Sequence, residues 1–231
     1  MTTKKEFITD ITNKLGRPLP EKIEPPDFSD HPADGLYDDF SKQDFIDQFI
    51  RELEALSGKV IRVPSMNALP DAIHSFLKEG DVSDVVVWSD EDERSVTIRK
   101  ACDAYAGQKK DARVLVWEDK ENRGELIAAV EQADAGVVYA EYGISETGTV
   151  VLYNKAGKGR SASVLPNNIG IVLNTKKIVP RITQVFEQLH EPAIDHSCIN
   201  FISGPSRSAD IEMSLSIGVH GPGEITVFLV D

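Results

Sequence analysis

The sequence is poor in cysteine, and its two cysteines lie far apart. Cys102 and Cys198 are the only thiols in 231 residues, and neither belongs to a C-x-x-C pair. Iron–sulfur clusters and structural zinc sites usually take about four closely spaced Cys or His ligands. The sequence therefore predicts no disulfide framework, no zinc ribbon and no iron–sulfur site held by this chain alone. The five histidines show no metal-ligand spacing either, so we expect no metal site.

Long hydrophobic runs are also missing. No apolar stretch approaches the roughly 20 residues that span a bilayer. The first residues lead into a polar helical pattern rather than an apolar signal segment. We therefore expect a cytoplasmic protein that does not insert into membranes. Net positive charge is lacking too, because 38 acidic residues outnumber 25 basic ones and the formal net charge is −13. This argues against a nucleic-acid partner.

Proline divides the chain into two parts. Phe7, Ile8, Ile11 and Leu15 recur at helical spacing, and Gly16 follows as a stop signal. Five prolines then fall between residues 17 and 36, where they exclude regular structure and indicate a linker. We expect a helix and Pro-rich linker over residues 1–36, and an α/β domain over residues 37–231. The first helix has to dock on its own domain or on a partner.

The domain alternates strand and helix patterns. Ser41 and Asp44 form a predicted capping box for a helix that ends at Gly58. Continuous apolar runs predict strands, and they are separated by segments with helical spacing, which indicates a parallel sheet covered on both faces. The second half is rich in turns and allows antiparallel pairs. The predicted strands are 59–63, 84–88, 113–117, 135–140, 149–153, 169–173, 198–203 and 225–230, and the further helices are 68–77, 125–131 and 178–189.

A long segment without acidic residues stands out in this acidic chain. Residues 147–186 contain no Asp or Glu, although the chain has 38 of them. A positive surface there would attract a carboxylate, a phosphate or an acidic partner. Acidic side chains from the first half of the fold would instead neutralise it, and both interpretations stay open. The cations of this segment are Lys155, Lys158, Arg160, Lys176, Lys177 and Arg181.

Three loops hold further candidate residues. The small residues of 203–210 follow a predicted strand and precede a helical stretch. Their backbone N–H groups and Arg207 could together bind an anion, or the segment is a plain turn with a helix cap. Glu146 lies beside a glycine turn. It is either a nucleophile or general base, or an ordinary residue that stabilises the turn. His220 occupies a tight turn. The expected ligand-binding residues are Thr147, Gly148, Arg160, Gly204, Ser206, Arg207, Asp210 and His220.

Several of these segments occur together in one known family. They are SETGTVVL from Ser145, KGRSASVLP from Lys158, IVPR from Ile178, ISGPSRSADIE from Ile202 and GVHGP from Gly218. In this order they resemble the LUD (lactate-utilization) domain. The resemblance extends over essentially the whole chain, since the opening helix that ends Leu15-Gly-Arg-Pro18 is similar too.

The resemblance implies both a fold and a role. The fold is an α/β sandwich around a mostly parallel sheet, similar to the NagB/RpiA/CoA-transferase group. The role is that of a non-redox subunit in a cytosolic system that oxidises L-lactate to pyruvate, with iron–sulfur clusters in the partner subunits and no cofactor in this chain. On this interpretation Lys155, Lys158, Lys176, Lys177 and Arg181 form a partner surface, and the chain also binds a small carboxylate. Alternatively, the chain is a transferase or hydrolase that acts on an acyl or phosphorylated substrate through Glu146.

Overall fold

The chain forms two compact units in a computed structural model. The structure describes residues 3–16, 26–27, 35–118, 123–189, 197–209, 215–218 and 220–231. The first unit, Met1–Asp38, contains helix α1 (Lys4–Leu15). Thr3 and Glu6 form a capping box at its start, and Gly16 ends it in the left-handed conformation, as predicted. Most of the predicted Pro-rich linker lies outside the described residues.

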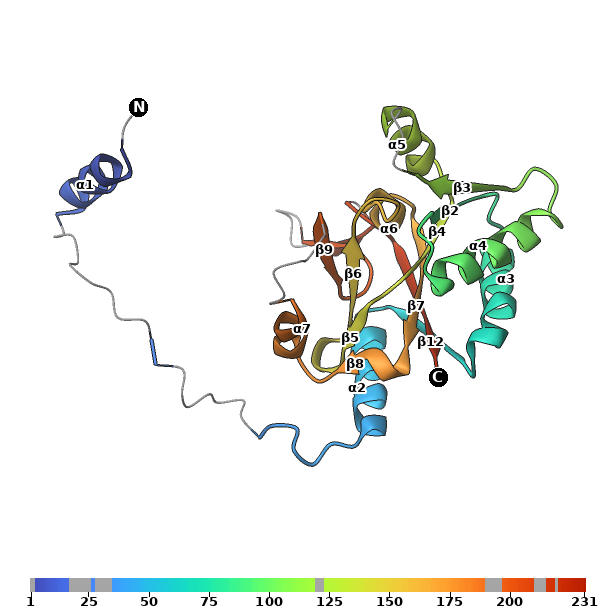
Figure 1. Cartoon of the computed structure of the whole chain (residues 1–231), viewed down its shortest axis with the longest axis horizontal. Helices are drawn as coiled ribbons and strands as arrows, with labels where there is room; N and C mark the ends of the chain where they lie inside the picture. The colour runs from blue at the N-terminus through green and yellow to red at the C-terminus, as the bar shows by residue number, and fades with distance from the viewer. Residues whose placement is uncertain are drawn as a thin grey trace. The chain divides into compact units, whose positions relative to one another are not determined.

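The second unit, Asp39–Asp231, is built on a six-stranded parallel sheet. Figure 1 shows α3 (Leu69–Glu79) and α4 (Glu93–Ala106) on one side of this sheet, and a second sheet with α6 (Ser161–Val164) on the other. The expected α/β fold around a mostly parallel sheet is confirmed. In spatial order the strands are β1 (Lys59–Val63), β12 (Glu224–Val230), β7 (Asn168–Asn174), β4 (Ala135–Tyr139), β2 (Asp84–Trp88) and β3 (Arg113–Trp117).

The second sheet has four strands and is mostly antiparallel, which confirms antiparallel pairing in the second half. β5 pairs antiparallel with β6, β6 pairs antiparallel with β9, and β5 pairs parallel with β8. The elements of this half are β5 (Tyr142–Ile144), η2 (Ser145–Thr147), β6 (Thr149–Asn154), η3 (Thr175–Lys177), β8 (Ile178–Val179), α7 (Ile182–Gln188) and β9 (Cys198–Ile202). The remaining elements are α2 (Lys42–Ala55), η1 (Met66–Ala68), α5 (Arg123–Glu131), β10 (Arg207–Ala209) and β11 (Leu215–Ile217).

The central strands are buried on both faces. Val86, Val87, Val137 and Ile171 have no exposed surface, as expected for parallel strands between two covering layers. None of the helices among the described residues is long and apolar enough to cross a membrane. A compact core of this kind can hold polar side chains in fixed positions at the ends of its strands.

Two local predictions need correction, and a third lies almost entirely outside the described residues. Helix α4 was not predicted, because its buried face includes small or polar residues such as Ser95 and Cys102. The helix expected from Ile178 begins at Ile182 instead, since Pro180 interrupts the segment and β8 pairs with β5. The helical stretch expected after the 203–210 loop lies almost entirely outside the described residues. Within the loop itself, strand β10 pairs with β11.

The strand order creates a switch point at β2 and β4. The chain passes from β2 through α4 to β3 on one side, whereas β4 lies on the other side of β2 and is followed in the sheet by β7. The loops that leave β2 and β4 therefore diverge above the carboxyl edge of the sheet. In open α/β sheets this crevice is where ligand-handling residues usually lie.

Candidate functional site

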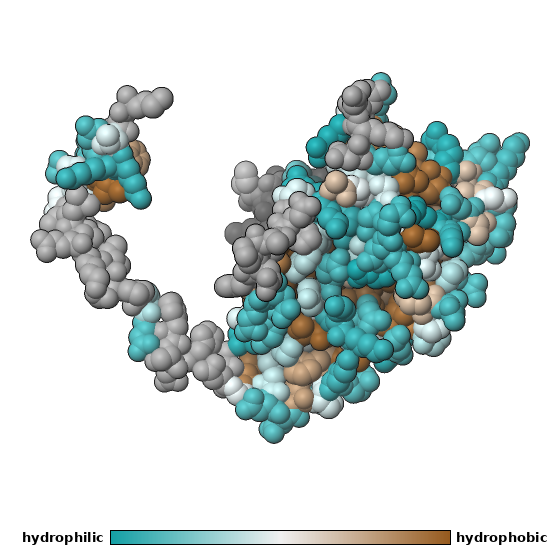
Figure 2. Space-filling model, in the orientation of Figure 1, coloured by the Kyte–Doolittle hydropathy of each residue, from teal (hydrophilic) through white to brown (hydrophobic). Residues whose placement is uncertain are grey.

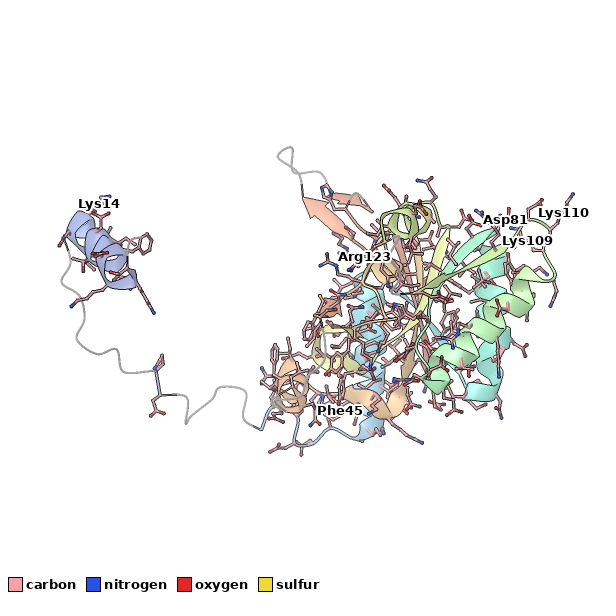
Figure 3. The ribbon with its side chains drawn as sticks, turned by 45° about the horizontal axis from the view of Figure 1, so that its top comes forward. Lys14, Phe45, Asp81, Lys109, Lys110 and Arg123 are labelled. Carbon is pink, nitrogen blue, oxygen red and sulfur yellow. The ribbon has the colours of Figure 1, made fainter. Side chains whose placement is uncertain are left out.

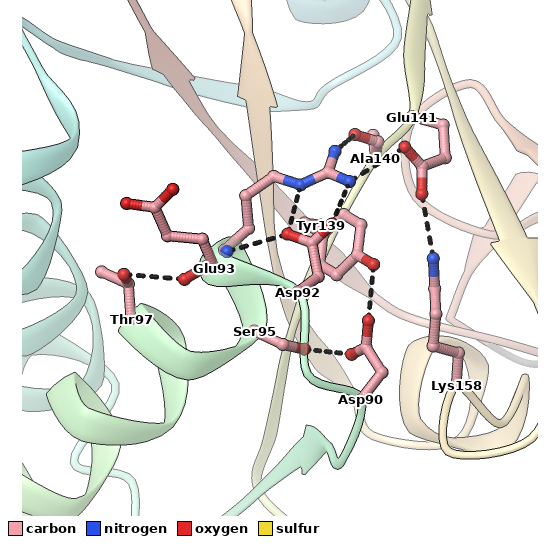
Figure 4. Close-up of polar contacts among 10 residues, drawn as sticks. Asp90, Asp92, Glu93, Ser95, Thr97, Tyr139, Ala140, Glu141 and Lys158 are labelled. Atoms are coloured by element: carbon pink, nitrogen blue, oxygen red, sulfur yellow. Dashed lines mark hydrogen bonds and ion pairs between the residues drawn. The ribbon is translucent and has the colours of Figure 1, made fainter.

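A network of charged side chains fills the switch point (Figure 4). Asp90 follows β2 by two residues, and Asp92 caps the start of α4 by accepting from the backbone N–H of Arg94 at 2.9 Å. Glu141 follows β4 by two residues. Lys158 reaches the same point from the turn after β6. Three separate segments thus place three carboxylates and two cations together.

Arg94 joins two of the carboxylates. Its Nε and one terminal nitrogen each donate to Asp92 at 2.8 Å, in the bidentate geometry that suits a guanidinium. The same terminal nitrogen lies 3.0 Å from Oε2 of Glu141, and the other donates to the Ala140 carbonyl at 3.2 Å. The guanidinium also stacks over the Tyr139 ring at 3.8 Å from its centroid. This pairing lowers the pKa of Asp92 to about 2.

Lys158 is the buried member of the network. Its side chain is only 2% exposed, and Nζ donates to Oε1 of Glu141 at 3.0 Å. The ammonium lies 4.2 Å from the centroid of the Tyr139 ring and 5.0 Å from that of Trp88. Burial lowers the pKa of Lys158, and Glu141 offsets part of that shift. Burial alone would raise the pKa of Glu141, but the charges of Lys158 and Arg94 outweigh it, so this pKa lies below its usual value.

Tyr139 connects the charged network to α4. Its hydroxyl donates to Oδ2 of Asp90 at 2.7 Å, and Ser95 Oγ donates to the other oxygen of the same carboxylate. Burial and the bond to Asp90 raise the pKa of Tyr139, so the phenol stays protonated at neutral pH. The backbone of Asp90 is held as well, since the guanidinium of Arg99 donates to its main-chain carbonyl at 2.8 Å. The hydrogen bonds fix the position of every carboxylate in the network.

The network holds protons and charges in place but has no spare cation. Both Arg94 and Lys158 are bound to carboxylates, and the three carboxylates outnumber them. An anionic ligand would have to compete with these carboxylates for Arg94 or Lys158, so carboxylate binding is not the chemistry that this arrangement favours. Asp92 and Glu141 keep 32% and 21% of their side chains exposed, which leaves them partly open to solvent as hydrogen-bond acceptors.

A pocket of about 450 Å³ adjoins the network through the turn that carries Lys158. Lys158 points inward to Glu141, while Lys155 and Arg160 on either side line the pocket. The pocket is lined by Trp117, Arg123, Asn154, Lys155, Ala156, Gly157, Gly159, Arg160, Ser197 and Cys198. The described residues contain no group of three or more His, Cys, Asp or Glu side chains that could hold a metal ion.

Glu146 lies in the η2 turn rather than in the network. Its Oε2 accepts from Nε of Arg181 at 3.1 Å, and its backbone N–H donates to the Pro180 carbonyl at 3.1 Å. Thr147 shares a hydrogen bond of 2.7 Å with Thr149. Gly148 packs against the backbone of α2, where an added Cβ would lie 2.3 Å from a main-chain nitrogen.

The Gly204–Arg207 loop packs against the end of α2. A Cβ on Gly204 would lie 2.9 Å from the Leu56 carbonyl oxygen, and Arg207 donates to Ser57 Oγ at 3.0 Å. The Ser206 backbone bonds to Pro222 and Gly218. His220 is exposed, and Asp210 lies outside the described residues. The structure therefore gives Glu146, Arg160 and Arg207 three different surroundings.

The cations of the acid-free segment divide into two groups. Lys158 and Arg181 are neutralised by Glu141 and Glu146, which lie just before the segment in the chain. Since Lys158 is 2% exposed, its predicted place on a partner surface is wrong. Lys155, Arg160, Lys176 and Lys177 are exposed, so a positive surface remains at the two turns that carry them.

Sequence reasoning missed most of the network. Asp90, Asp92, Arg94, Tyr139 and Glu141 were not among the expected site residues. A usable signal was present, because Asp90 and Glu141 each follow a predicted parallel strand directly. Polar residues at the carboxyl ends of such strands are candidates by position alone.

Comparison with known proteins identifies the family. The family model of the LUD domain matches residues 46–230, which is most of the second unit. The chain belongs to the LUD domain family. The resemblance that the motifs predicted is therefore confirmed, and the network lies within the LUD domain.

The LUD domain here has relatives that match over nearly their whole length. Lactate utilization protein C 1 of Bacillus mycoides is 33% identical over 234 residues, covering 99% of this chain and 97% of the relative. Lactate utilization protein C of Halalkalibacterium halodurans is 35% identical, covering 94% and 92%. The crystal structure of a DUF162 family protein from Deinococcus radiodurans superposes with a TM-score of 0.59 at 22% identity, covering 83% of this chain and 99% of that one, which supports the fold.

Proposed function

We propose that this protein is a non-redox subunit of a cytosolic system that oxidises L-lactate to pyruvate. The observation that carries the proposal is the near full-length similarity, at 33% and 35% identity, to proteins named lactate utilization protein C. A match that includes the N-terminal helix as well as the LUD domain supports a shared role better than a match to one domain would.

Electron transfer in this proposal takes place on iron–sulfur partner subunits. A cluster bound by cysteine alone takes about four thiolates, whereas this chain has two cysteines. Cys102 is fully buried in helix α4, and Cys198 lies on β9 in the four-stranded sheet. Two thiols on separate elements do not make such a ligand set, so the clusters are assigned to partners.

An apolar surface suited to a partner lies on α7 and β9. Three large side chains are exposed there, with Ile182 at 41%, Phe186 at 46% and Phe201 at 36%. The rings of Phe186 and Phe201 pack 5.9 Å apart. Figure 2 shows hydrophobic surface among hydrophilic residues beside the place where Figure 1 labels α7. Lys176 and Lys177 are exposed on η3 in the same half of the domain, so this half offers both apolar area and positive charge to a partner.

The alternative role as a Glu146-dependent transferase or hydrolase has no comparable support. The carboxylate of Glu146 is bound to Arg181, and the turn that carries it is packed against α2. This geometry fits a residue that stabilises a turn. The partner role is therefore the one we propose.

Deletion of the gene in its host tests the role. We expect the deletion strain to lose growth on L-lactate, to keep growth on pyruvate, and to recover when the wild-type gene is restored. A tagged protein should also co-purify with an iron–sulfur protein, and the double charge reversal K176E/K177E should weaken this association in a salt-sensitive way. K110E, at an exposed lysine on another part of the domain, is the matched control. Normal growth of the deletion strain on L-lactate would refute the proposal.

A further inference from the structure

Three cations line the pocket beside the Lys158 turn, and in the part of the chain that the structure describes none of them pairs with a carboxylate. Arg123 from the start of α5 and Lys155 and Arg160 from the turn after β6 all line it. No ion pair joins any of these three cations to a carboxylate among the described residues, and no acidic residue is among the described residues that line the pocket. By contrast, Lys59, Lys109 and Arg113 each pair with a carboxylate. In a chain of net charge −13, three unpaired cations around one cavity indicate an anion site.

The floor of the pocket is rigid and sterically tight. Gly157 has a φ of 76°, a conformation that favours glycine. Gly159 lies against the indole of Trp117, where a Cβ would come within 2.0 Å of a ring atom. Trp88 Nε1 donates to the Gly159 carbonyl at 3.0 Å, and Ser89 donates its backbone N–H to the Gly157 carbonyl at 2.9 Å. Both ends of the turn are thus tied to β2, so the backbone that bears the cations is pre-organised.

Asn154 completes this support from inside the pocket wall. Its Nδ2 donates to the Lys158 carbonyl at 2.9 Å, and its Oδ1 accepts from Asn200 at 2.6 Å. The side chain is 1% exposed. Because its donor and acceptor are both used within the protein, Asn154 positions the turn, and the charged side chains remain available to a ligand.

We infer that this pocket binds a phosphorylated ligand that carries at least two negative charges, of the class of inorganic diphosphate and nucleoside diphosphates. Three cations line it, and a single carboxylate would neutralise only one of them. Arginine binds phosphate in a bidentate manner, and two of the three cations are arginines. The volume of about 450 Å³ falls within the usual range for small-molecule sites and far exceeds what lactate or pyruvate needs.

Calorimetric titration of the full chain tests the inference. The ligands are inorganic diphosphate, ADP, orthophosphate and L-lactate, each at low and at physiological salt. We expect saturable binding of diphosphate or ADP that weakens with salt, weaker binding of orthophosphate, and no competition from L-lactate. Stronger binding of ADP than of diphosphate would indicate a nucleotide as the source of the phosphates, and the reverse would indicate free diphosphate.

Variants separate this pocket from general charge effects. R123Q, K155Q and R160Q each change an exposed side chain, so the fold should be retained. Each should weaken diphosphate binding about tenfold or more, because each removes one charge-assisted contact. K110Q is the matched control, since Lys110 is exposed and lies far from Arg123 (Figure 3) and should leave binding unchanged.

Three results would overturn the inference. They are the absence of binding by both diphosphate and ADP, equal affinity in K155Q, R160Q and the wild type, and competition by L-lactate at similar affinity. The inference does not rest on the proposed role in lactate oxidation. A failed titration would leave the growth test unaffected, and normal growth of the deletion strain would leave the pocket unaffected.

Discussion

The substitution Glu141→Gln offers the sharpest test of the buried network. Glutamine keeps the shape of the side chain but removes its charge. Lys158, which is 2% exposed and 3.0 Å from Glu141, would then be a buried ammonium without a carboxylate. The reverse change, Lys158→Met, leaves Glu141 bound to Arg94 at 3.0 Å. The two halves of one ion pair are therefore unequal, and removal of the carboxylate should be the more damaging change.

The magnitude follows from the burial of each partner. Removing one member of a buried ion pair typically costs about 3–5 kcal/mol. Glu141 is 21% exposed, and the rings of Tyr139 and Trp88 still face the ammonium, so we place Glu141→Gln near the lower limit, at about 3 kcal/mol. Lys158→Met should cost about 1 kcal/mol, since its partner keeps a counter-ion. The double variant should cost about 2 kcal/mol, less than the two single changes combined, because no unpaired charge remains.

Urea unfolding of the four proteins at pH 7 measures these free energies, and thermal unfolding should show Glu141→Gln about 6–12 °C below wild type. Burial lowers the pKa of Lys158 in the folded state, and without Glu141 it should fall further below the unfolded value. The folded variant then loses this proton at a lower pH than the unfolded chain, so its deficit should shrink as pH rises from 7 to 10. A deficit independent of pH, or one smaller than that of Lys158→Met, would refute the reasoning.

Three further predictions concern single residues. The folded pKa of Asp92 is about 2, so its stabilisation is present above the unfolded pKa of 3.8 and is lost as pH falls through 2. Asp92→Asn should therefore reduce the stability that is lost below pH 4 by about 1 kcal/mol after solvent screening, and urea midpoints from pH 2 to 5 that match wild type would contradict this. Gly148→Ala should destabilise the domain by more than about 2 kcal/mol in thermal unfolding, since the φ of Gly148 is 57° and a Cβ would lie 2.3 Å from the α2 backbone. Gly16 has a φ of 62° but open space around it, so Gly16→Ala should leave the melting of the domain unchanged. Burial raises the pKa of the Cys102 thiol and encloses it fully, so iodoacetamide should alkylate Cys198 alone in the native protein and both cysteines in urea, as read by mass spectrometry; native labelling of Cys102 would show that α4 opens.

The strands were predictable because burial on both faces leaves a strong local signal. The strands Lys59–Val63, Asp84–Trp88 and Arg113–Trp117 have the bounds that the sequence predicts. Their order in the sheet was not predictable, because it depends on contacts between distant segments. The interior face of α4 carries small and polar residues, so its helical pattern was too weak to detect.

The site was harder to predict than the fold, because a charge acquires its role from a partner elsewhere in the chain. The acid-free segment correctly marked a concentration of positive charge, but it could not show which cations are neutralised. Lys158 is bound to Glu141, and Arg181 is bound to Glu146. In each pair the cation and the carboxylate come from different segments that the fold brings together. Only the folded structure separates these two from the exposed Lys155, Lys176 and Lys177.

This division gives the acid-free segment a physical explanation. In the turn between β6 and α6, Lys158 points inward to a carboxylate at the end of β4, while Lys155 and Arg160 point into the pocket. An acidic residue within the turn would compete with Glu141 for Lys158, and would also neutralise the pocket. Asn154 supports the same turn from the second sheet without adding charge. The absence of acidic residues thus preserves both the Lys158–Glu141 ion pair inside the domain and the positive charge of the proposed anion pocket. The same turn connects β6 of the second sheet to α6.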